Sequence, residues 1–226
     1  MSFRVKLSRI STFVNCWKVQ INSSRVFAVM PAHVAVYKEN NKWRKSIFLN
    51  KCDKNLIKKC NWKVPFQWST NFDPHNDFAW TEIDNNNCEG TVLKKSMCDI
   101  DNPMDVSFYF SHTIDHNGKI CSMATFGKIN GTIYKSPCSN LLEAPGIGFR
   151  GMSGAIATDR YGDCVGMLLR RGSNLGETKF DGINSEYKFS NNLTSLRRSL
   201  IMPFDLMSAH IKNNNSINID DLINKD

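Results

Sequence analysis

Long apolar runs are missing from this chain of 226 residues. No run of about 18 apolar residues occurs, the length that signals a membrane-spanning helix. The first residues, MSFRVKLSRI, are basic but lead to no apolar segment with a small-residue cleavage site. We therefore expect no membrane span, no secretory signal and a cytoplasmic location.

The eight cysteines include no Cys-x-x-Cys pair. Cys52 and Cys60, and likewise Cys88 and Cys98, are too far apart in the sequence for the usual spacing of zinc ligands. Without a secretory signal, free thiols in a reducing compartment are the better expectation. We expect no metal site and no other cofactor.

Charge of one sign is in excess, because 29 Lys and Arg residues face 21 Asp and Glu residues and give a net charge of +8. Basic residues gather in segments 38–46, 54–59 and 168–171. A solvated basic surface is the favoured interpretation. Weak RNA binding through this surface is the alternative, and it depends on charge alone because no RNA-binding module signature is present.

A long helical repeat is absent from most of the chain, where short segments rich in β-branched and aromatic residues alternate with turn-forming residues. The expected strands are FVNCWKVQI (13–21), RVFAVMPAHVAVY (25–37), SIFL (46–49), DFAWTEI (77–83), VSFYFS (106–111), ICSMATFGKI (120–129), GTIYKS (131–136), GAIAT (154–158), CVGMLLR (164–170) and SEYKFS (185–190). This pattern predicts an all-β barrel or sandwich.

A polar segment with Pro103, CDIDNPMD (98–105), divides the strands into two similar sets. The simplest architecture is therefore two small domains, residues 1–100 and 101–213. In the second domain, MPFDLMSAHIK (202–212) has helical spacing, with Pro203 suited to a helix start and Asp205 to the positive N-terminal end. Residues 214–226 are polar, and we expect a disordered tail there.

One serine lies in a glycine-rich stretch, GMSGA (151–155), where glycines permit a sharp turn and close approach to backbone amides. A serine hydroxyl needs a base and oxyanion donors to act as a nucleophile, so Ser153 alone is weak evidence. His33 follows an apolar strand, and Asp77 opens another, from which a carboxylate could orient a histidine. A structural histidine and a turn aspartate are the plain alternatives.

The other histidines have less suitable settings: His75, His112 and His116 lie in polar loops, and His210 is on the expected terminal helix. Competing acids precede no comparably clean apolar segment: Asp53, Asp73 and Asp84.

The order His, Asp, Ser resembles that of chymotrypsin-like serine proteases. The matching motifs are MPAHV (30–34), NDFAW (76–80), GMSGA (151–155) and CVGMLLRRGS (164–173), and the resemblance spans roughly residues 13 to 212. It implies two six-stranded antiparallel β-barrels with a short C-terminal helix. It also implies that Ser153 is the nucleophile, His33 the base and Asp77 the acid, with the backbone N–H groups of Gly151 and Ser153 as the oxyanion hole.

Departures from the secreted members of that family are informative. Val34 stands where they have a cysteine, Ala155 replaces a second glycine, and their Ile/Val-Val-Gly-Gly start is absent. These differences resemble the compact intracellular branch typified by viral polyprotein-processing proteases, as does the MPFDLM segment. The implied substrate is a polypeptide, including the protein's own polyprotein, in the host cytoplasm if the source is viral.

In this family, one pocket wall precedes the serine and the other is the strand at 166–173. Ile147 replaces the acidic residue of relatives that cleave after Arg or Lys, and Leu168, Leu169 and Arg170 provide no histidine of the kind found in Gln- or Glu-specific viral relatives. We therefore expect an apolar pocket. Pairing of Arg170 or Arg171 with an acidic substrate side chain is the less favoured alternative.

Two other functions stay open at this point. One is an HtrA-like cellular quality-control protease, although no second peptide-binding domain is evident in this sequence. The other is a degenerate protease fold that binds RNA or protein without catalysis, which the three triad candidates argue against.

Overall fold

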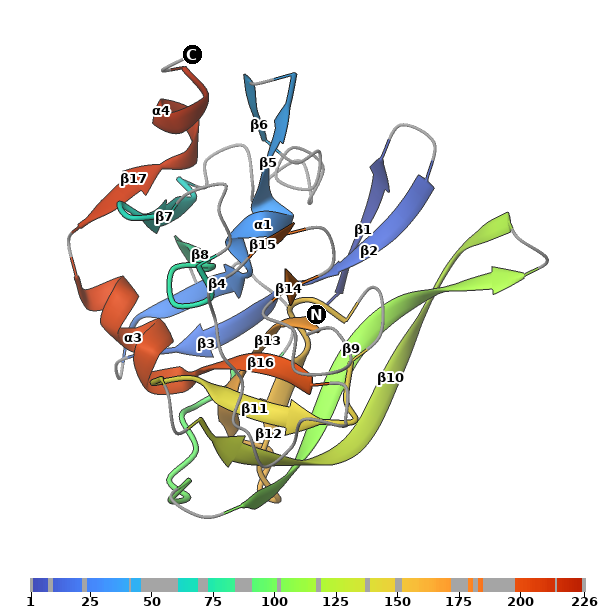
Figure 1. Cartoon of the computed structure of the whole chain (residues 1–226), viewed down its shortest axis with the longest axis vertical. Coiled ribbons are helices and arrows are strands. Elements are labelled where there is room, and N and C mark those ends of the chain that lie inside the picture. Colours follow the sequence, from blue (N-terminus) through green and yellow to red (C-terminus); the bar gives the residue numbers. More distant parts are fainter. Residues whose placement is uncertain are drawn as a thin grey trace.

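The computed structural model describes residues 2–7, 10–21, 24–40, 42–45, 61–68, 73–83, 91–100, 103–116, 119–136, 139–148, 152–171, 179–180, 183–184, 198–213 and 215–224. The chain is mainly β, as predicted, and the strands form a barrel in its second half and a sheet in its first half (Figure 1). Three small hairpins complete the strands: β1 (Ser2–Leu7) with β2 (Ile10–Asn15), β5 (Val36–Glu39) with β6 (Lys42–Lys45), and β14 (Lys179–Phe180) with β15 (Ile183–Asn184).

The second half contains a closed barrel of six antiparallel strands, in the order β10-β11-β16-β13-β12-β9. Its strands are β9 (Met104–His116), β10 (Lys119–Lys135), β11 (Leu142–Pro145), β12 (Ile156–Thr158), β13 (Cys164–Arg171) and β16 (Arg198–Pro203). Apolar side chains such as Phe108, Ile133 and Ile201 fill its interior. The prediction of a six-stranded barrel is therefore confirmed for this half.

Four strands of the first half and β17 from the C-terminal end form an open sheet in the part of the chain that the structure describes, with the strand order β17-β7-β8-β4-β3. Its strands are β3 (Trp17–Gln20), β4 (Val26–Met30), β7 (Lys63–Pro65), β8 (Ala79–Ile83) and β17 (Ser216–Asn218). A second closed six-stranded barrel is not present among these residues, because β5 and β6 pair only with each other and the expected strand at 46–49 lies outside the described residues.

β4 is apolar at every position because both faces of the sheet are covered. Phe27 and Val29 point to the side of the barrel, whereas Ala28 and Met30 belong to a cluster on the opposite face. A strand buried on both faces loses the polar alternation that a half-exposed strand would show. The continuous apolar run before His33 is therefore explained by the central position of β4 in the sheet.

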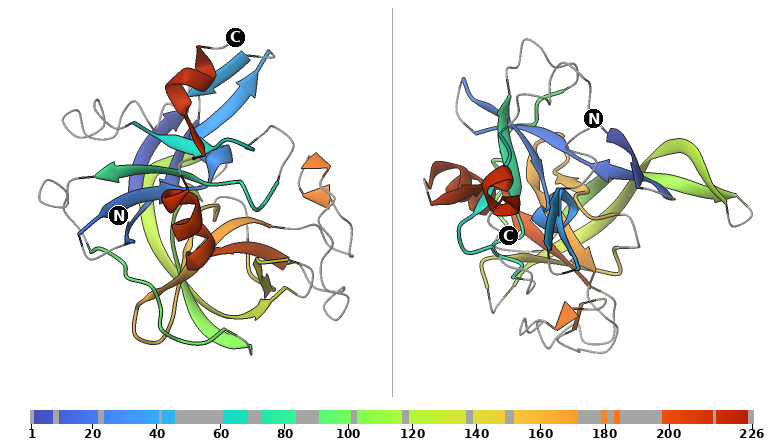
Figure 2. Two further views of the ribbon diagram at one scale, coloured as in Figure 1. Left: turned by 90° about the vertical axis from the view of Figure 1, so that its left-hand side faces the viewer. Right: turned by 90° about the horizontal axis from the view of Figure 1, so that it is seen from above.

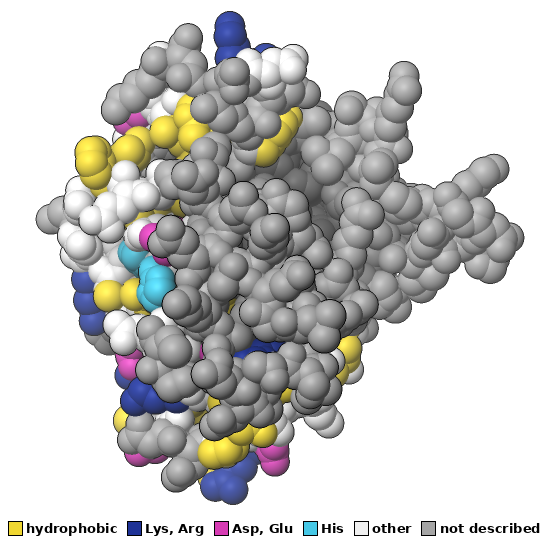
Figure 3. Space-filling view, in the orientation of Figure 1, with side chains coloured by type: hydrophobic (Ala, Val, Ile, Leu, Met, Phe, Trp, Pro, Cys, Tyr) yellow, Lys and Arg dark blue, Asp and Glu magenta, His cyan; other side chains and the backbone are white. Residues whose placement is uncertain are grey.

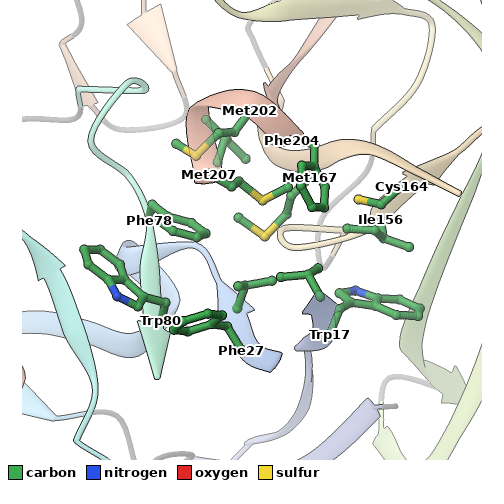
Figure 4. Packing of buried hydrophobic residues seen from close by; sticks show 13 residues of the cluster. Trp17, Phe27, Phe78, Trp80, Ile156, Cys164, Met167, Met202, Phe204 and Met207 are labelled. Atoms are coloured by element: carbon green, nitrogen blue, oxygen red, sulfur yellow. The ribbon is translucent and has the colours of Figure 1, made fainter. Parts of the chain in front are cut away.

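One buried cluster, here called the shared core, joins the two halves (Figure 4). It consists of Trp17, Val19, Phe27, Val29, Phe78 and Trp80 from the first half and Ile156, Cys164, Met167, Leu169, Met202, Phe204 and Met207 from the second. Burial of apolar surface contributes about 25 cal/mol per Å². Sheet, barrel and terminal helix are thereby held in one arrangement.

Three helices are described: α1 (Ala32–Ala35), α3 (Phe204–Lys212) and α4 (Ile219–Ile223). The predicted C-terminal helix is confirmed as α3, with Pro203 at its N-cap and Asp205 in its first turn. Two further views show α3 lying where the sheet and the barrel meet (Figure 2). None of the described helices is long and apolar enough to cross a membrane.

The expected disordered tail is wrong for residues 215–224. β17 pairs antiparallel with β7, and Ile219 of α4 is fully buried in the cluster on the outer face of the sheet. The two isoleucines of SINI (216–219) explain the difference, because they supply the apolar surface that disorder lacks.

The segment 91–100 between the two halves is bonded to both of them. Leu93 exchanges backbone hydrogen bonds with the β3 region, donating to Lys18, while Ser96 donates to Cys164 of the barrel over 2.8 Å. The proposed domain boundary near residues 98–105 stays a prediction.

Candidate active site

His33 lies in α1, the single helical turn that directly follows β4. Pro31 begins this turn, and its carbonyl accepts a hydrogen bond from Val34 N over 3.1 Å. Proline fixes its own φ and so favours a sharp change from strand to helix. The turn leaves the His33 side chain 20% exposed, beyond the C-terminal end of β4.

Asp77 lies two residues before β8, and 1% of it is exposed. Its Oδ1 accepts a hydrogen bond from His33 N at 2.8 Å, and its Oδ2 lies 2.6 Å from His33 Nδ1. Both carboxylate oxygens are therefore occupied by a single partner residue. The structure thus brings together two of the three residues predicted to form the triad.

This pairing fixes the protonation pattern of the imidazole. An ionised carboxylate only accepts hydrogen bonds, so Nδ1 of His33 must carry the hydrogen. In the neutral ring, Nε2 is then the acceptor and can take a proton from another group. His33 is held in the tautomer that a general base requires.

Ser153 lies on a tight turn between residues 152 and 155. Ala155 N donates to Met152 O over 2.8 Å, and Gly154 has a φ of +83°. A positive φ at the third residue of a β-turn strongly favours glycine. Two further bonds fix the turn to β13, since Gly154 N donates to Leu168 O and Leu168 N donates to Ala155 O.

The serine turn packs against the histidine turn. A Cβ atom on Gly154 would lie 3.1 Å from Pro31 Cδ and 2.5 Å from the carbonyl oxygen of Asn15. Pro31 begins the helix that carries His33, so Ser153 and His33 belong to neighbouring turns from different halves of the chain. Within the described residues, the Ser153 hydroxyl makes no hydrogen bond, and catalytic hydrogen bonds are often long in the absence of substrate.

Two side chains that the sequence analysis did not single out hold the serine turn from the first half. Asn15 Nδ2 donates to Ser153 O over 3.1 Å, and Trp17 Nε1 donates to Gly154 O over 2.8 Å. Asn15 is buried, and buried polar groups normally have a bonding partner. An asparagine inside an otherwise apolar strand segment was the signal that could have drawn attention to it.

The residues predicted to line the substrate pocket lie in apolar cores. Ile147 and Leu168 belong to the barrel interior, and Leu169 belongs to the shared core. At 9%, 1% and 0% exposed, respectively, they present little surface to a ligand. Arg170 is in β13, but its side chain lies outside the described residues, as does all of Gly151. The pocket and the oxyanion hole therefore stay predictions.

Acidic and histidine side chains lie close together in the turn before Asp77. Asp73 Oδ1 accepts from His75 N, and Asp73 Oδ2 accepts from Asn76 Nδ2. The hydrogen bond from the His75 side chain is the main cause that lowers the pKa of Asp73, against the opposing effect of burial. Figure 3 shows histidine atoms beside acidic atoms on the visible face of the molecule.

No metal centre is formed by the residues that the structure describes, since nowhere among them do three His, Cys, Asp or Glu side chains converge. Cys16, Cys98 and Cys164 are free thiols. Burial strongly raises the pKa of Cys164, which makes it a poor nucleophile.

Comparison with protein-family models finds no match, and neither does comparison with curated proteins. Among solved structures, the 3CL protease of Cavally virus is 10% identical with a TM-score of 0.49, covering 95% of this chain and 66% of that one. A Glu endopeptidase is 13% identical (TM-score 0.48, covering 93% and 94%), and the thermostable serine protease AL20 from an extremophilic microorganism is 11% identical (0.47, 94% and 96%). This chain thus spans just under two thirds of the Cavally virus protein.

Each of these three structures is named as a protease or an endopeptidase. At TM-scores below 0.5, this likeness decides nothing about the chemistry, which must follow from the chain's own residues.

Proposed function

We propose that this chain is a serine endopeptidase with the triad His33, Asp77 and Ser153. The observation that carries the proposal is the buried Asp77 carboxylate, which holds both the backbone N–H and the Nδ1–H of His33. The contact between Gly154 and Pro31 adds support, because it sets the serine turn beside the histidine turn.

The reaction follows from these groups. As Ser153 Oγ bonds to the scissile carbonyl carbon, its proton passes to His33 Nε2 and the carbonyl π electrons move onto oxygen. Collapse of the tetrahedral intermediate breaks the C–N bond, and His33 gives its proton to the leaving amine. His33 then takes a proton from water as the water oxygen bonds to the acyl carbon. Collapse of this second intermediate breaks the bond to Ser153 Oγ, and His33 returns the proton to that oxygen. Asp77 stabilises the charged imidazole in both stages, and the N–H groups of Gly151 and Ser153 are the proposed oxyanion donors.

Ser153→Ala tests the nucleophile directly. We expect the variant to fold and to lose both cleavage of a peptide library and labelling by a fluorophosphonate probe, whereas the wild-type protein is labelled. A wild-type protein that neither cleaves peptides nor reacts with the probe would contradict the proposal and favour a binding module.

Asp77→Asn tests the acid. An amide accepts hydrogen bonds at its oxygen only, so its NH2 group would face one of the two N–H donors of His33 and favour the wrong tautomer. The same change costs about 10⁴-fold in kcat in a well-studied serine protease. Asp73→Asn is the matched control, because Asp73 lies in the same turn and no hydrogen bond between it and His33 is described. A larger loss in Asp73→Asn than in Asp77→Asn would show that the acid is misassigned.

We further propose that the substrate is a polyprotein of viral origin, because the sequence departures at Val34 and Ala155 resemble the compact viral branch. Digestion of peptide libraries and of the parent polyprotein, followed by sequencing of the products, tests this. Efficient cleavage of unfolded cellular proteins without a preferred sequence would instead favour the quality-control protease. RNA binding has only the net charge of +8 in its favour.

A further inference from the structure

His210 of α3 contacts the turn that presents Asp77. Its Nε2 lies 2.6 Å from the carbonyl oxygen of His75, two residues before Asp77. Its ring also stacks on Phe78, the residue after Asp77, with ring centroids 5.8 Å apart and planes inclined by 29°. One side chain from the C-terminal helix therefore holds the chain on both sides of Asp77.

The roles in the hydrogen bond are fixed by its acceptor. A backbone carbonyl only accepts, so Nε2 of His210 carries the hydrogen. Burial is the main cause that lowers the pKa of His210; the hydrogen bond with His75 and the charge of Asp73 oppose it, and the charge of His75 adds to it. The lowered pKa favours the neutral ring, which adds no charge next to the acid.

The hydrogen bonds described within the turn use other groups than the His75 carbonyl, which accepts from His210. Asp73 binds the backbone and side-chain nitrogens of His75, while Asn76 O accepts from Phe78 N over 2.8 Å. Phe78 in turn stacks on Trp80 at 5.3 Å within the shared core. The position of Asp77 is therefore set between a buried aromatic stack and a carbonyl that His210 holds.

We propose that His210 is a positioning residue for Asp77, acting through the His75 carbonyl and the Phe78 ring. The inference rests on the proposed function, because it treats Asp77 as the catalytic acid. His210 is 135 residues from His75 in sequence, and it makes α3 part of the active-site support. A small displacement of a catalytic group can cost about 10²-fold in rate.

His210→Met and His210→Gln form the decisive pair, since the two side chains have nearly the same length and only Gln donates a hydrogen bond. We expect His210→Met to lower kcat by about 10- to 100-fold with KM unchanged, because Asp77 touches no substrate. His210→Gln should restore most of kcat. Equal losses in the two variants would overturn the proposal, since the donor would then not matter.

A second readout does not depend on catalysis. The Nδ1 proton of His33, bonded to Asp77 over 2.6 Å, should give a low-field proton NMR signal that is identified by its loss in His33→Ala. We expect this signal to shift or broaden in His210→Met and to persist in His210→Gln. An unchanged signal and kcat in His210→Met, alongside a crippled Asp77→Asn, would refute the positioning role while leaving the proposed function intact.

Two controls sharpen the test. His75→Ala keeps the backbone carbonyl and should retain the signal and most of kcat; a loss as large as in His210→Met would show that the His75 imidazole is the group that matters. If His210→Met does not fold, His210→Phe keeps a ring against Phe78 and still lacks the donor, so the same loss of signal is expected. If the wild-type protein has no peptidase activity, the proposed function fails, and the NMR comparison still decides whether His210 positions Asp77.

Discussion

Gly154 must satisfy two requirements at once. Its φ of +83° suits glycine, and an added Cβ would meet the carbonyl oxygen of Asn15 at 2.5 Å, closer than such atoms can approach. The first requirement comes from the turn that presents Ser153, and the second comes from the docking of that turn on the first half of the chain. The glycine after the serine thus serves tertiary packing as well as turn geometry.

Gly162→Ala provides the comparison for Gly154→Ala. Gly162 has a φ of +86° with no atom within 4 Å of an added Cβ, so only the left-handed conformation opposes alanine, at about 1–2 kcal/mol. We expect Gly154→Ala to lower the free energy of unfolding by clearly more than this and to abolish peptidase activity, whereas Gly162→Ala keeps it. Urea titration and a peptide assay measure both effects. A similar loss of unfolding free energy in the two variants would mean that the close contact of residue 154 with the Asn15 carbonyl does not affect stability.

At the scale of elements, two strands of the first half support the serine turn, β3 through Trp17 and β2 through its last residue, Asn15. Trp17 Nε1 donates to Gly154 O inside the protein, so its loss leaves a buried carbonyl without this donor. Trp62 offers a contrast, because its buried Nε1 has no hydrogen-bond partner among the described residues. The indole N–H of Trp17 therefore contributes a buried hydrogen bond to stability, and no such bond is described for Trp62.

Trp17→Phe should lower the free energy of unfolding by about 1–3 kcal/mol more than Trp62→Phe, since an unsatisfied buried polar group costs about that much. It should also reduce kcat, because the displaced carbonyl belongs to the residue after Ser153. Chemical denaturation and steady-state kinetics are the measurements. A larger destabilisation by Trp62→Phe would argue against the hydrogen bond from Trp17.

A second link between elements centres on Asp159 in the turn after β12. Its Oδ2 accepts a hydrogen bond from Ser96 Oγ at 2.6 Å, and its Oδ1 accepts from the backbone of Tyr161 and Asp163. Burial alone would raise the pKa of Asp159, but these hydrogen bonds outweigh it and lower the pKa below its usual value. The segment 91–100 and the barrel are thus joined through the ionised carboxylate of Asp159.

This link predicts a loss of stability in acid. A carboxyl whose pKa is lower in the folded state stabilises the fold above its unfolded pKa of about 3.9, and the stabilisation disappears as pH falls through the lower, folded value. We expect the free energy of unfolding to fall between pH 5 and pH 2 less steeply in Asp159→Asn than in the wild type. Urea titrations across that range measure the difference, and identical slopes would contradict the assignment.

At the scale of the whole molecule, the shared core makes the sheet and the barrel one cooperative unit. Phe27 is a buried member of that core, whereas Phe66 is 59% exposed on the turn after β7. Removing a buried phenylalanine leaves a cavity as well as losing apolar burial. The consequence should reach both halves of the protein.

Phe27→Ala should cost about 3–5 kcal/mol, and Phe66→Ala should cost little. We expect a single unfolding transition in the wild type, with circular dichroism and tryptophan fluorescence giving the same midpoint. Separate transitions for the two probes would show that the halves unfold independently.

The β class and the helix at 202–212 could be predicted from the sequence because both rest on local patterns that hold wherever the strands lie. The pairing of His33 with Asp77 was implied by the resemblance of three ordered motifs to a known family. An apolar run marks β4, Pro203 and Asp205 mark the start of α3, and the order of three short motifs suggests the triad. Two other predictions, a second closed barrel and a disordered tail, differ from the structure of the described residues. Both depend on which strand edges meet, and the end of the chain supplies β17 to β7.

The contacts that support the site could not be predicted from local sequence patterns. Asn15 with Ser153 and His210 with His75 are separated by more than a hundred residues in the sequence, and each is a hydrogen bond from a side chain to a backbone carbonyl. Every residue has such a carbonyl, so no residue type marks the acceptor. The partner is therefore set by the packing of the sheet, the barrel and α3, which brings one carbonyl within reach of the donor.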